Sequence, residues 1–319
     1  MIDWNTKNVL VTGGAGFLGS FVTKLLRRKN VKKLIIPRSK DCDLTDVSNC
    51  KRIVKGVDIV FHLAAKVGGI GLNLERPAEL FYDNLIMGVQ LMNEAKLAGV
   101  QKFIALGTIC SYPKFATVPF SENSIWDGYP EETNAPYGLA KKMLLVQSQA
   151  YRKQYGFKSI VVFPTNLYGP GDNFDPSSSH VIPALIMKVY KAKELKKNLI
   201  TVWGDGSPTR DFLYVQDAAS GVVKAAERFD GQDPLNLGSE EEISIKELVL
   251  KIVNLMDFAG KIIWDTSKPN GQPRRCVSNQ RASALIGFKP KIGMEEGLKR
   301  TISWFENNMS RNADRLYWK

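Results

Sequence analysis

The stretch VLVTGGAGFLG, from Val9 to Gly19, decides the fold of this chain. It begins as a short apolar run, turns through a cluster of glycines, and enters a helical pattern over Phe17–Lys29. The glycines can be spaced as Gly14-x-Gly-x-x-Gly19 or as Gly13-x-x-Gly-x-x-Gly19. Glycines at such a turn let the backbone approach a pyrophosphate at a helix N-terminus, where free N–H groups stabilise negative charge. Its place after the first strand predicts a dinucleotide-binding loop; a plain strand-to-helix turn is the alternative.

Short β-rich runs alternate with helical patterns through the first half of the chain. The predicted strands are Asn8–Thr12, Lys33–Ile36, Asp58–His62, Lys102–Leu106 and Ser159–Phe163. The predicted helices are Phe17–Lys29, Pro77–Gly99 and Pro136–Tyr155. This order predicts an α/β fold, with a doubly wound parallel sheet wrapped by helices on both faces.

The rhythm breaks after Phe163, where the loop-rich NLYGPGDNFDPSSSHVIP marks a change of domain. We expect a first domain over residues 1–171, rejoined by segments near 211–238, and a smaller, mostly helical domain over 172–319. The elements predicted after the break are Ile200–Trp203, Val215–Arg228, a helix opened by the capping box Ser244-Ile-Lys-Glu247, Lys261–Trp264 and Met294–Glu306.

The composition is that of a globular protein, with 319 residues, 44% hydrophobic and 24% charged. The N-terminal residues have no secretory pattern, and no apolar run approaches the ~18 residues needed to span a bilayer. Four scattered cysteines suggest neither a zinc site nor a disulfide framework. We therefore expect a cytoplasmic protein with no metal and no membrane partner.

The net charge of +12 is spread along the chain instead of forming one block. The densest run, Lys24 to Lys33, falls at the end of a predicted helix, where cations interact favourably with the dipole. Small polyanions such as dinucleotides or nucleotide sugars suit this charge better than nucleic acid. A merely solvated surface is the third reading.

The end of the second predicted strand bears on the choice of dinucleotide. An NAD site would place a carboxylate there, on the ribose hydroxyls. This strand is followed instead by Arg38 and Lys40, which favour a 2′-phosphate and hence NADP(H). Asp41 lies close by, and solvated loop charges are the alternative.

The stretch YGLAK places Tyr137 and Lys141 early in a predicted helix, four residues apart and therefore on one face. A nearby ammonium favours the phenolate and lowers the pKa of a tyrosine from about 10. Such a phenol can give its proton to a carbonyl oxygen that receives a hydride. Lys141 can also reach the cofactor ribose, and Thr108 can hydrogen-bond the same carbonyl.

At this point the chain resembles the extended short-chain dehydrogenase/reductases. VTGGAGFLG, Asp43-Leu44, HLAA (62–65), Tyr137-x-x-x-Lys141 and NLYGP (166–170) carry the resemblance, which covers essentially the whole chain. It implies a Rossmann domain for the cofactor, a smaller domain for a nucleotide sugar, and Asp43 near the adenine. The implied cofactor-binding residues are Gly13, Gly14, Gly16, Phe17, Leu18, Gly19, Arg38, Asp43, Leu44, Ala64, Leu106, Tyr137, Lys141, Pro164, Asn166, Leu167 and His180.

Five longer strings are similar to one member family, the GDP-L-fucose synthases: AAKVGGI (64–70), CSYPK (110–114), PTNLYGPGDNFDPSSSHVIPALI (164–186), WGDGSPTRDFLYVQD (203–217) and KPNGQPRR (268–275). That family inverts carbons 3 and 5 of GDP-4-keto-6-deoxy-mannose and reduces its 4-ketone. The chain departs from some members at Ala15, where they carry a basic residue toward the 2′-phosphate.

The resemblance assigns Cys110 and His180 as the pair that inverts the two carbons. Inversion removes a proton from one face and returns one to the other, so it needs two proton-transfer groups. We expect cysteine to be the base and histidine the acid. A free thiol ionises near pH 8.5, so a cationic neighbour or a local dipole must help it. An inert thiol and a loop histidine are the alternatives, and we interpret His62 as structural.

The family pattern also maps onto substrate residues. These are Lys188, Trp203, Arg210 and Arg274, with Arg275 as a further candidate. Arg210 suits the sugar-nucleotide pyrophosphate through its fork geometry, and surface cations are the alternative. The family implies a homodimer formed by Pro77–Gly99 and Pro136–Tyr155, although both helices could simply cover the sheet. Rival functions are a related epimerase/reductase acting on another GDP-deoxyhexose or GDP-heptose, and a non-catalytic NADP sensor.

Overall fold

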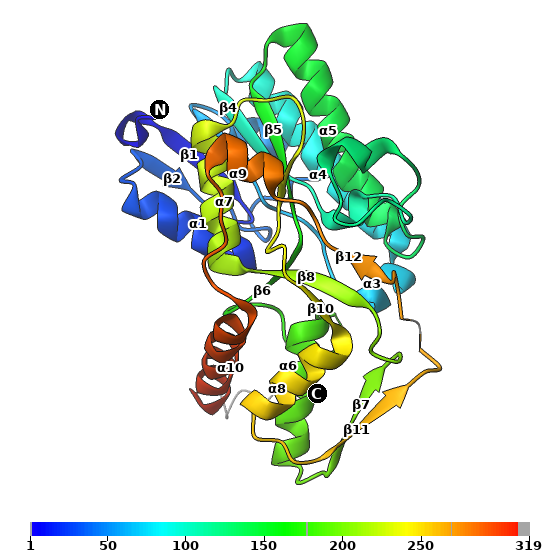
Figure 1. The fold of residues 1–319 in the computed structure, drawn as a ribbon. Helices are drawn as coiled ribbons and strands as arrows, with labels where there is room; N and C mark the ends of the chain where they lie inside the picture. Colours follow the sequence, from blue (N-terminus) through cyan, green and yellow to red (C-terminus); the bar gives the residue numbers. More distant parts are fainter. Residues whose placement is uncertain (1, 177, 269, 312–319) are drawn as a thin grey trace.

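The computed structural model describes residues 2–176, 178–268 and 270–311, so the last eight residues of the predicted second domain lie outside it (Figure 1). Figure 1 shows a sheet flanked by helices above a smaller lobe, and the chain passes between the two parts several times. We call them the sheet lobe and the small lobe.

The sheet lobe is built on six parallel strands in the order β2-β1-β3-β4-β5-β9. Their bounds are β1 (Asn8–Thr12), β2 (Lys33–Ile35), β3 (Ile59–His62), β4 (Lys102–Leu106), β5 (Ser159–Pro164) and β9 (Leu235–Leu237). This confirms the predicted α/β class. The chain reverses direction across the sheet between β1 and β3, and parallel α/β sheets bind their ligands at such a switch point.

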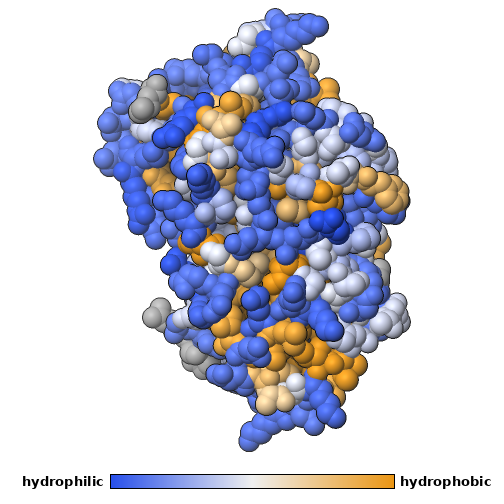
Figure 2. Space-filling model, in the orientation of Figure 1, coloured by the Kyte–Doolittle hydropathy of each residue, from blue (hydrophilic) through white to orange (hydrophobic). Residues whose placement is uncertain are grey.

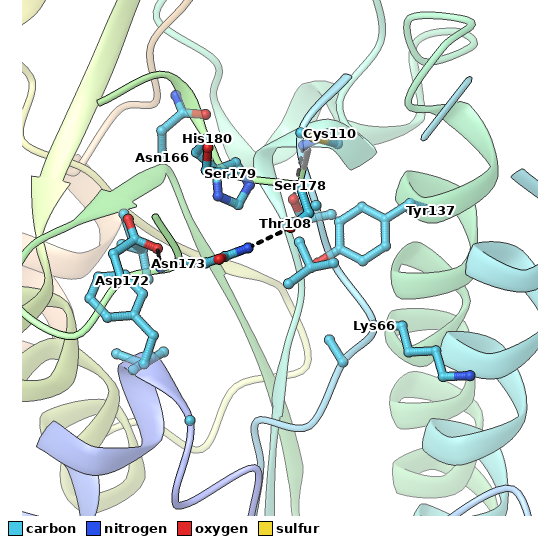
Figure 3. A pocket seen from close by; sticks show the side chains of 18 of the residues that line it. Lys66, Thr108, Cys110, Tyr137, Asn166, Asp172, Asn173, Ser178, Ser179 and His180 are labelled. Carbon is cyan, nitrogen blue, oxygen red and sulfur yellow. Dashed lines mark hydrogen bonds between the residues drawn. The ribbon is translucent and has the colours of Figure 1, made fainter. Parts of the chain in front are cut away.

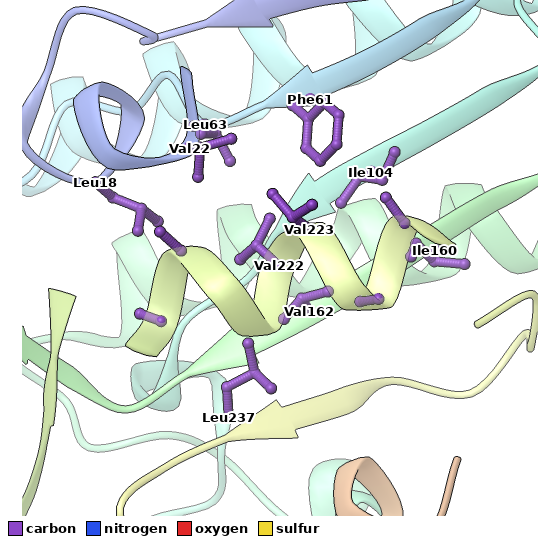
Figure 4. Close-up of a cluster of buried hydrophobic side chains, with 14 of the residues drawn as sticks. Leu18, Val22, Phe61, Leu63, Ile104, Ile160, Val162, Val222, Val223 and Leu237 are labelled. Atoms are coloured by element: carbon purple, nitrogen blue, oxygen red, sulfur yellow. The ribbon is translucent and has the colours of Figure 1, made fainter. Parts of the chain in front are cut away.

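Alternation along β1 explains why both faces of the sheet need covering. Val9 and Val11 are buried in one core and Leu10 in the other, since successive side chains of a strand point to opposite faces. On the first face lie α1 (Phe17–Arg28), α7 (Val215–Arg228) and α9 (Gln280–Ile286); on the second lie α2 (Val47–Ile53), α4 (Pro77–Leu97) and α5 (Ala135–Tyr155). Figure 4 shows Val222 and Val223 of α7 packed toward Phe61 and Ile104 of the sheet.

The small lobe contains α6 (Val181–Glu194), α8 (Ile245–Leu255) and α10 (Met294–Arg311) around its own apolar core. One sheet joins β6 (Asn166–Tyr168), β8 (Thr209–Tyr214), β10 (Glu242–Ser244) and β12 (Arg274–Arg275), and a second pairs β7 (Leu199–Trp203) with β11 (Lys261–Asp265). The sequence did not predict the first of these sheets, because strands of two to six residues leave little periodicity.

The remaining short elements are η1 (Trp4–Thr6), α3 (Ile70–Glu75), η2 (Ile109–Ser111) and η3 (Glu122–Trp126). The small lobe exposes apolar side chains, among them Leu199, Leu250 and Ile263, and Figure 2 shows apolar surface gathered on the lower part of the molecule. Among the described residues, no helix combines the length and the apolar character that crossing a membrane requires.

Candidate active site

A cavity of about 1120 Å³ opens at the carboxyl edge of the sheet and is lined by both lobes (Figure 3). Its walls are formed by the loop after β1, the end of β4, the start of α5, the segment 64–71, and the loop that leads into α6. This volume exceeds the range of typical sites for one small molecule, so it has room for two extended ligands.

The glycine loop fits a dinucleotide pyrophosphate because its backbone leaves no space for side chains. Gly13 has φ +69°, and a Cβ there would lie 2.7 Å from the Ala64 nitrogen. A Cβ on Gly19 would lie 2.0 Å from the Gly13 oxygen, so α1 starts in direct contact with the turn. Gly13, Gly16 and Gly19 line the cavity, whereas Gly14 lies behind them. The N-terminus of α1 therefore reaches the cavity through a closely packed turn whose N–H groups can meet an anion.

The loop after β2 brings Arg38 to the cavity but not Lys40. Arg38 is exposed there. Asp43 and Leu44 also line the cavity, and the Asp43 carboxylate accepts hydrogen bonds from the Thr45 N–H at 2.9 Å and from its hydroxyl at 2.8 Å. These bonds lower the pKa of Asp43, so it carries a negative charge at this edge.

Thr108, Cys110 and Tyr137 meet where β4 ends against the start of α5 (Figure 3). The Thr108 hydroxyl accepts a hydrogen bond from the Cys110 N–H at 3.3 Å. The contact between the two segments depends on Gly138, since a Cβ there would lie 2.2 Å from the Cys110 carbonyl oxygen. The Ser111 hydroxyl donates to the Gly138 carbonyl at 2.8 Å and fastens the same junction.

The predicted effect of Lys141 on Tyr137 is wrong for this state of the protein. Burial raises the pKa of Tyr137, and the nearby Cys110 raises it further, while a hydrogen bond with Thr108 acts in the other direction. Lys141 is itself buried, and burial lowers its pKa to about 8. Both groups lose hydration in the same interior, so desolvation outweighs the attraction between ammonium and phenolate. Lys141 lies behind the cavity wall.

His62 is fully buried behind the same wall. The Thr12 hydroxyl and the His62 Nδ1 are hydrogen-bonded at 2.9 Å, while Nε2 has no partner. Burial, together with the Lys141 charge, lowers the pKa of His62 to about 3, so the ring is neutral. It does not line the cavity.

Cys110 has the cationic neighbour that the sequence required. Arg275 donates from Nη1 to the Cys110 Sγ at 3.5 Å. Sequence reasoning had placed Arg275 with the substrate phosphates instead. The thiol is half-buried and lines the cavity. Cys42, Cys50 and Cys276 are buried, although Cys42 also borders the cavity.

His180 is the N-cap residue of α6, and its ring makes no capping bond. Figure 3 shows it across the cavity from Cys110 and Tyr137. The side chain is exposed to the cavity yet surrounded by protein, and this burial lowers its pKa. The bonds that hold its loop include one from the Gly69 N–H to the Ser178 carbonyl at 3.0 Å and one from the Asn173 amide to the Ser178 hydroxyl at 2.9 Å.

Asp172 is a cavity residue that the sequence analysis did not single out. Burial raises its pKa to about 7, and its Oδ2 has no hydrogen-bond partner. It lies within the GPGDNFD part of a string that we had already quoted, so its position was available from the sequence but its burial was not.

Lys188, Trp203 and Arg210 line the small-lobe side of the cavity, whereas Arg274 does not. Arg274 and Arg275 are successive residues of β12, so their side chains leave on opposite faces. Arg274 forms two hydrogen bonds to Glu242, at 2.9 and 2.6 Å. The structure therefore does not bring Arg274 to the site. It is the Arg275 side chain that lines the cavity. Among the described residues, no cluster of His, Cys, Asp and Glu is placed to hold a metal ion.

Comparison with known proteins gives consistent matches over most of the chain. The family model described as "NAD dependent epimerase/dehydratase family" matches residues 9–238. The GDP-L-fucose synthase of Sinorhizobium fredii is 39% identical over 308 residues, which are 96% of this chain and 98% of the relative. The GDP-L-fucose synthase of Escherichia coli is 34% identical, covering 96% and 98%. A solved GDP-L-fucose synthetase from Naegleria fowleri bound to NADP is 32% identical, with a TM-score of 0.86 and coverage of 95% and 94%.

Proposed function

Because the chain belongs to the NAD dependent epimerase/dehydratase family, we propose that it is an NADP(H)-dependent 3,5-epimerase and 4-reductase that converts GDP-4-keto-6-deoxy-mannose to GDP-L-fucose. The observation that carries the proposal is that Cys110 and His180 line one cavity with Thr108 and Tyr137. A simple ketoreductase needs the threonine and the tyrosine. It has no use for a thiol and an imidazole beside the same ketone.

The sheet lobe supplies the residues that hold the dinucleotide. The glycine loop and the N-terminus of α1 receive the pyrophosphate, Arg38 the 2′-phosphate, and Asp43 the adenine end. When bound, NADPH supplies the hydride for the carbonyl carbon. The NADP in the Naegleria relative supports this choice of cofactor.

Tyr137 donates the proton that the reduced ketone oxygen needs. Its raised pKa keeps the phenol protonated until an oxyanion develops beside it, as an acid requires. Thr108 hydrogen-bonds the same oxygen and aligns it. Lys141, one helical turn away, supplies the positive charge that stabilises the phenolate after transfer.

Cys110 and His180 carry out the inversions. Carbons 3 and 5 flank the ketone, so the electron pair left by a departing proton moves onto the ketone oxygen as an enolate. The Cys110 thiolate takes that proton, and His180 returns one to the opposite face of the carbon. The lowered pKa of His180 makes its protonated ring a stronger acid for this step. Placement on segments that face each other across the cavity supports these complementary roles.

The small lobe supplies the nucleotide-sugar side. Arg210 lies on β8 and Lys188 on α6, both at the cavity wall. The Lys188 ammonium lies 5.9 Å from the centre of the Trp203 ring. We assign the sugar pyrophosphate to Arg210 and Lys188, because guanidinium and ammonium groups pair well with phosphate oxygens.

We also propose a cytoplasmic homodimer. The helices α4 and α5 pack side by side and leave Tyr82 and Val146 exposed, at 61% and 44%. The four free cysteines support a cytoplasmic location, because thiols stay reduced in that compartment. Light scattering at micromolar concentration should give twice the 35.6 kDa chain mass, and a monomer mass would overturn the dimer.

Proton exchange in deuterated water without NADPH tests the central proposal. With GDP-4-keto-6-deoxy-mannose, Tyr137→Phe should still exchange the protons at carbons 3 and 5. Cys110→Ala should lose that exchange by roughly 10²–10⁴-fold, the usual contribution of a general base. Exchange at the unmutated rate would remove the thiol from this role. Turnover of only another GDP-4-keto sugar would favour a related reductase.

A further inference from the structure

Arg275 is placed to act on the protein's own thiol instead of on a ligand. Its side chain is buried, with 8% exposed, and each of its three nitrogens already has a partner. Nη1 donates to the Cys110 Sγ at 3.5 Å, Nε donates to the Gln272 Oε1 at 2.7 Å, and Nη2 lies 3.8 Å from the Glu131 carboxylate. The guanidinium thus faces protein groups with all three of its nitrogens, and one of those groups is the thiol.

Gln272 and Glu131, the two partners of the guanidinium besides the thiol, are fixed by hydrogen bonds of their own. The Gln272 amide donates to the Lys114 carbonyl at 2.8 Å, at the end of the CSYPK segment that contains the thiol. Glu131 accepts from the Thr133 hydroxyl at 2.7 Å and from the Asn134 amide at 2.5 Å. Burial alone would raise the pKa of Glu131, but these hydrogen bonds and the Arg275 charge lower it, so it stays ionised.

The backbone next to Arg275 is also fixed. The Phe120 N–H donates to the Cys276 carbonyl at 2.7 Å, and the Ser278 N–H donates to the Phe120 carbonyl at 2.9 Å. These bonds tie the segment after β12, which belongs to the small lobe, to a loop of the sheet lobe. The hydrogen-bonded connection between the lobes therefore fixes the position of the guanidinium next to the thiol.

The charged groups around the sulfur leave a net positive charge beside it. Arg210 is paired with Arg275 in the register of β8 and β12, and both interact electrostatically with Glu131. Arg210, Arg275 and Glu131 give the neighbourhood one excess positive charge while the thiol is neutral, and ionisation of Cys110 would cancel it. Glu242 also interacts with Arg210, but its charge is matched by Arg274, to which it is hydrogen-bonded. A buried cation within hydrogen-bond distance is the arrangement that makes a cysteine reactive.

We propose that Arg275 holds Cys110 as the thiolate, and that Gln272 is the positioning residue that keeps its guanidinium on the sulfur. This deepens the proposed function, on which its catalytic meaning rests. The proton released on ionisation goes to solvent through the cavity, and the sulfur is then free to take a proton from the sugar.

The test is the pH dependence of Cys110 alkylation by iodoacetamide, measured by mass spectrometry on the whole protein with neither sugar nor cofactor present. The three other cysteines are buried, and the Cys110→Ser protein gives their background. Arg275→Gln should move the midpoint of alkylation upward by about 1–3 pH units, the usual effect of one adjacent cation. At pH 7 its alkylation should be correspondingly slower, by about tenfold per unit.

Matched variants separate this role from a structural one. Arg275→Lys keeps a charge and should retain most of the low midpoint, which also covers the case in which Arg275→Gln folds poorly. Gln272→Leu should raise the midpoint less than Arg275→Gln, and should add nothing in the Arg275→Gln background, because it acts through the arginine. Arg281→Gln removes another partly buried arginine, bound to Asn123 at 2.7 Å, and should leave the midpoint unchanged.

An unchanged midpoint in Arg275→Gln would overturn the proposal, as would an equal rise in Arg275→Gln and Arg275→Lys. Neither result depends on the substrate. A failure here leaves the exchange experiment with Cys110→Ala intact, and a failure of that experiment leaves the thiolate assignment intact.

Discussion

Gly138 lets α5, which carries Tyr137, pack closely against η2, which carries Cys110. Its replacement by alanine therefore tests the proposed geometry of the site. An alanine Cβ would lie 2.2 Å from the carbonyl oxygen of Cys110 and 2.8 Å from its carbonyl carbon. Ordinary van der Waals contact begins near 3.4 Å, so α5 and η2 must separate by about 1 Å. Both obstructing atoms belong to backbone, and no side-chain rotation can relieve them.

The activity should fall much more than the stability. Overpacking costs about 1–3 kcal/mol, and the gain in helix propensity from glycine to alanine offsets about 1 kcal/mol of it. The net change in the free energy of unfolding should therefore stay within about 2 kcal/mol. A displacement of about 1 Å in a catalytic constellation costs about 100-fold in rate, which corresponds to about 2.7 kcal/mol of activation free energy. We expect Gly138→Ala to lose about 100-fold in both isotope exchange and reduction.

The assay compares Gly138→Ala with Gly88→Ala, a mid-helix glycine of the neighbouring α4. A Cβ on Gly88 would meet the Leu144 Cδ2 at 2.5 Å, which is the end of a side chain that can turn away. Gly88→Ala should therefore shift the thermal midpoint without removing either activity. Full exchange and reduction by Gly138→Ala, or equal losses in the two variants, would show that the contact between α5 and η2 does not set the catalytic geometry.

Two further predictions concern the cofactor and its proton chemistry. Arg38→Ala should weaken NADPH binding and spare NADH, because only NADPH carries the 2′-phosphate that we assign to Arg38; equal losses in fluorescence titrations would refute the assignment. Burial lowers the pKa of Lys141 to about 8, so its ammonium is present below that pH and is lost as the pH rises through it. The kcat/KM for reduction should fall above about pH 8, and a profile that is flat to pH 10 would rule out a need for the charged lysine.

The sheet was predictable because its strands follow the simplest rules. Five of its six strands are apolar runs bounded by turn residues, and the helix Phe17–Arg28 begins at the predicted residue, directly after Gly16. The sixth strand, β9, is three residues long and was not predicted. The short strands of the small lobe were not predictable, since β12 is two residues long and depends on pairing with β8. Local sequence carries no signal for such pairing, which tertiary contacts alone create.

At the site, sequence could name side chains but not their surroundings. Cys110 was recognisable from its flanking string, and its need for a cation followed from thiol chemistry. Which cation meets it depends on the register that sends Arg275 toward the cavity and Arg274 toward Glu242. A one-residue shift of that register would exchange the two arginines. The same reasoning explains Tyr137, because spacing places a lysine one turn away and says nothing about the burial that dominates both groups.

In the proposed mechanism, the burial of Tyr137 and the position of Arg275 divide the proton chemistry within one cavity. A reductase proton donor must hold its proton, and an epimerase base must have lost its own, yet the two residues lie at one junction between η2 and α5. Desolvation raises the pKa of the phenol, while the guanidinium lies on the sulfur. The neighbouring Cys110 raises the pKa of the phenol further, which favours the protonated tyrosine that the proposed reduction needs. Loss of the Arg275 charge should therefore lower the rate of proton exchange at carbons 3 and 5 more than the rate of ketone reduction.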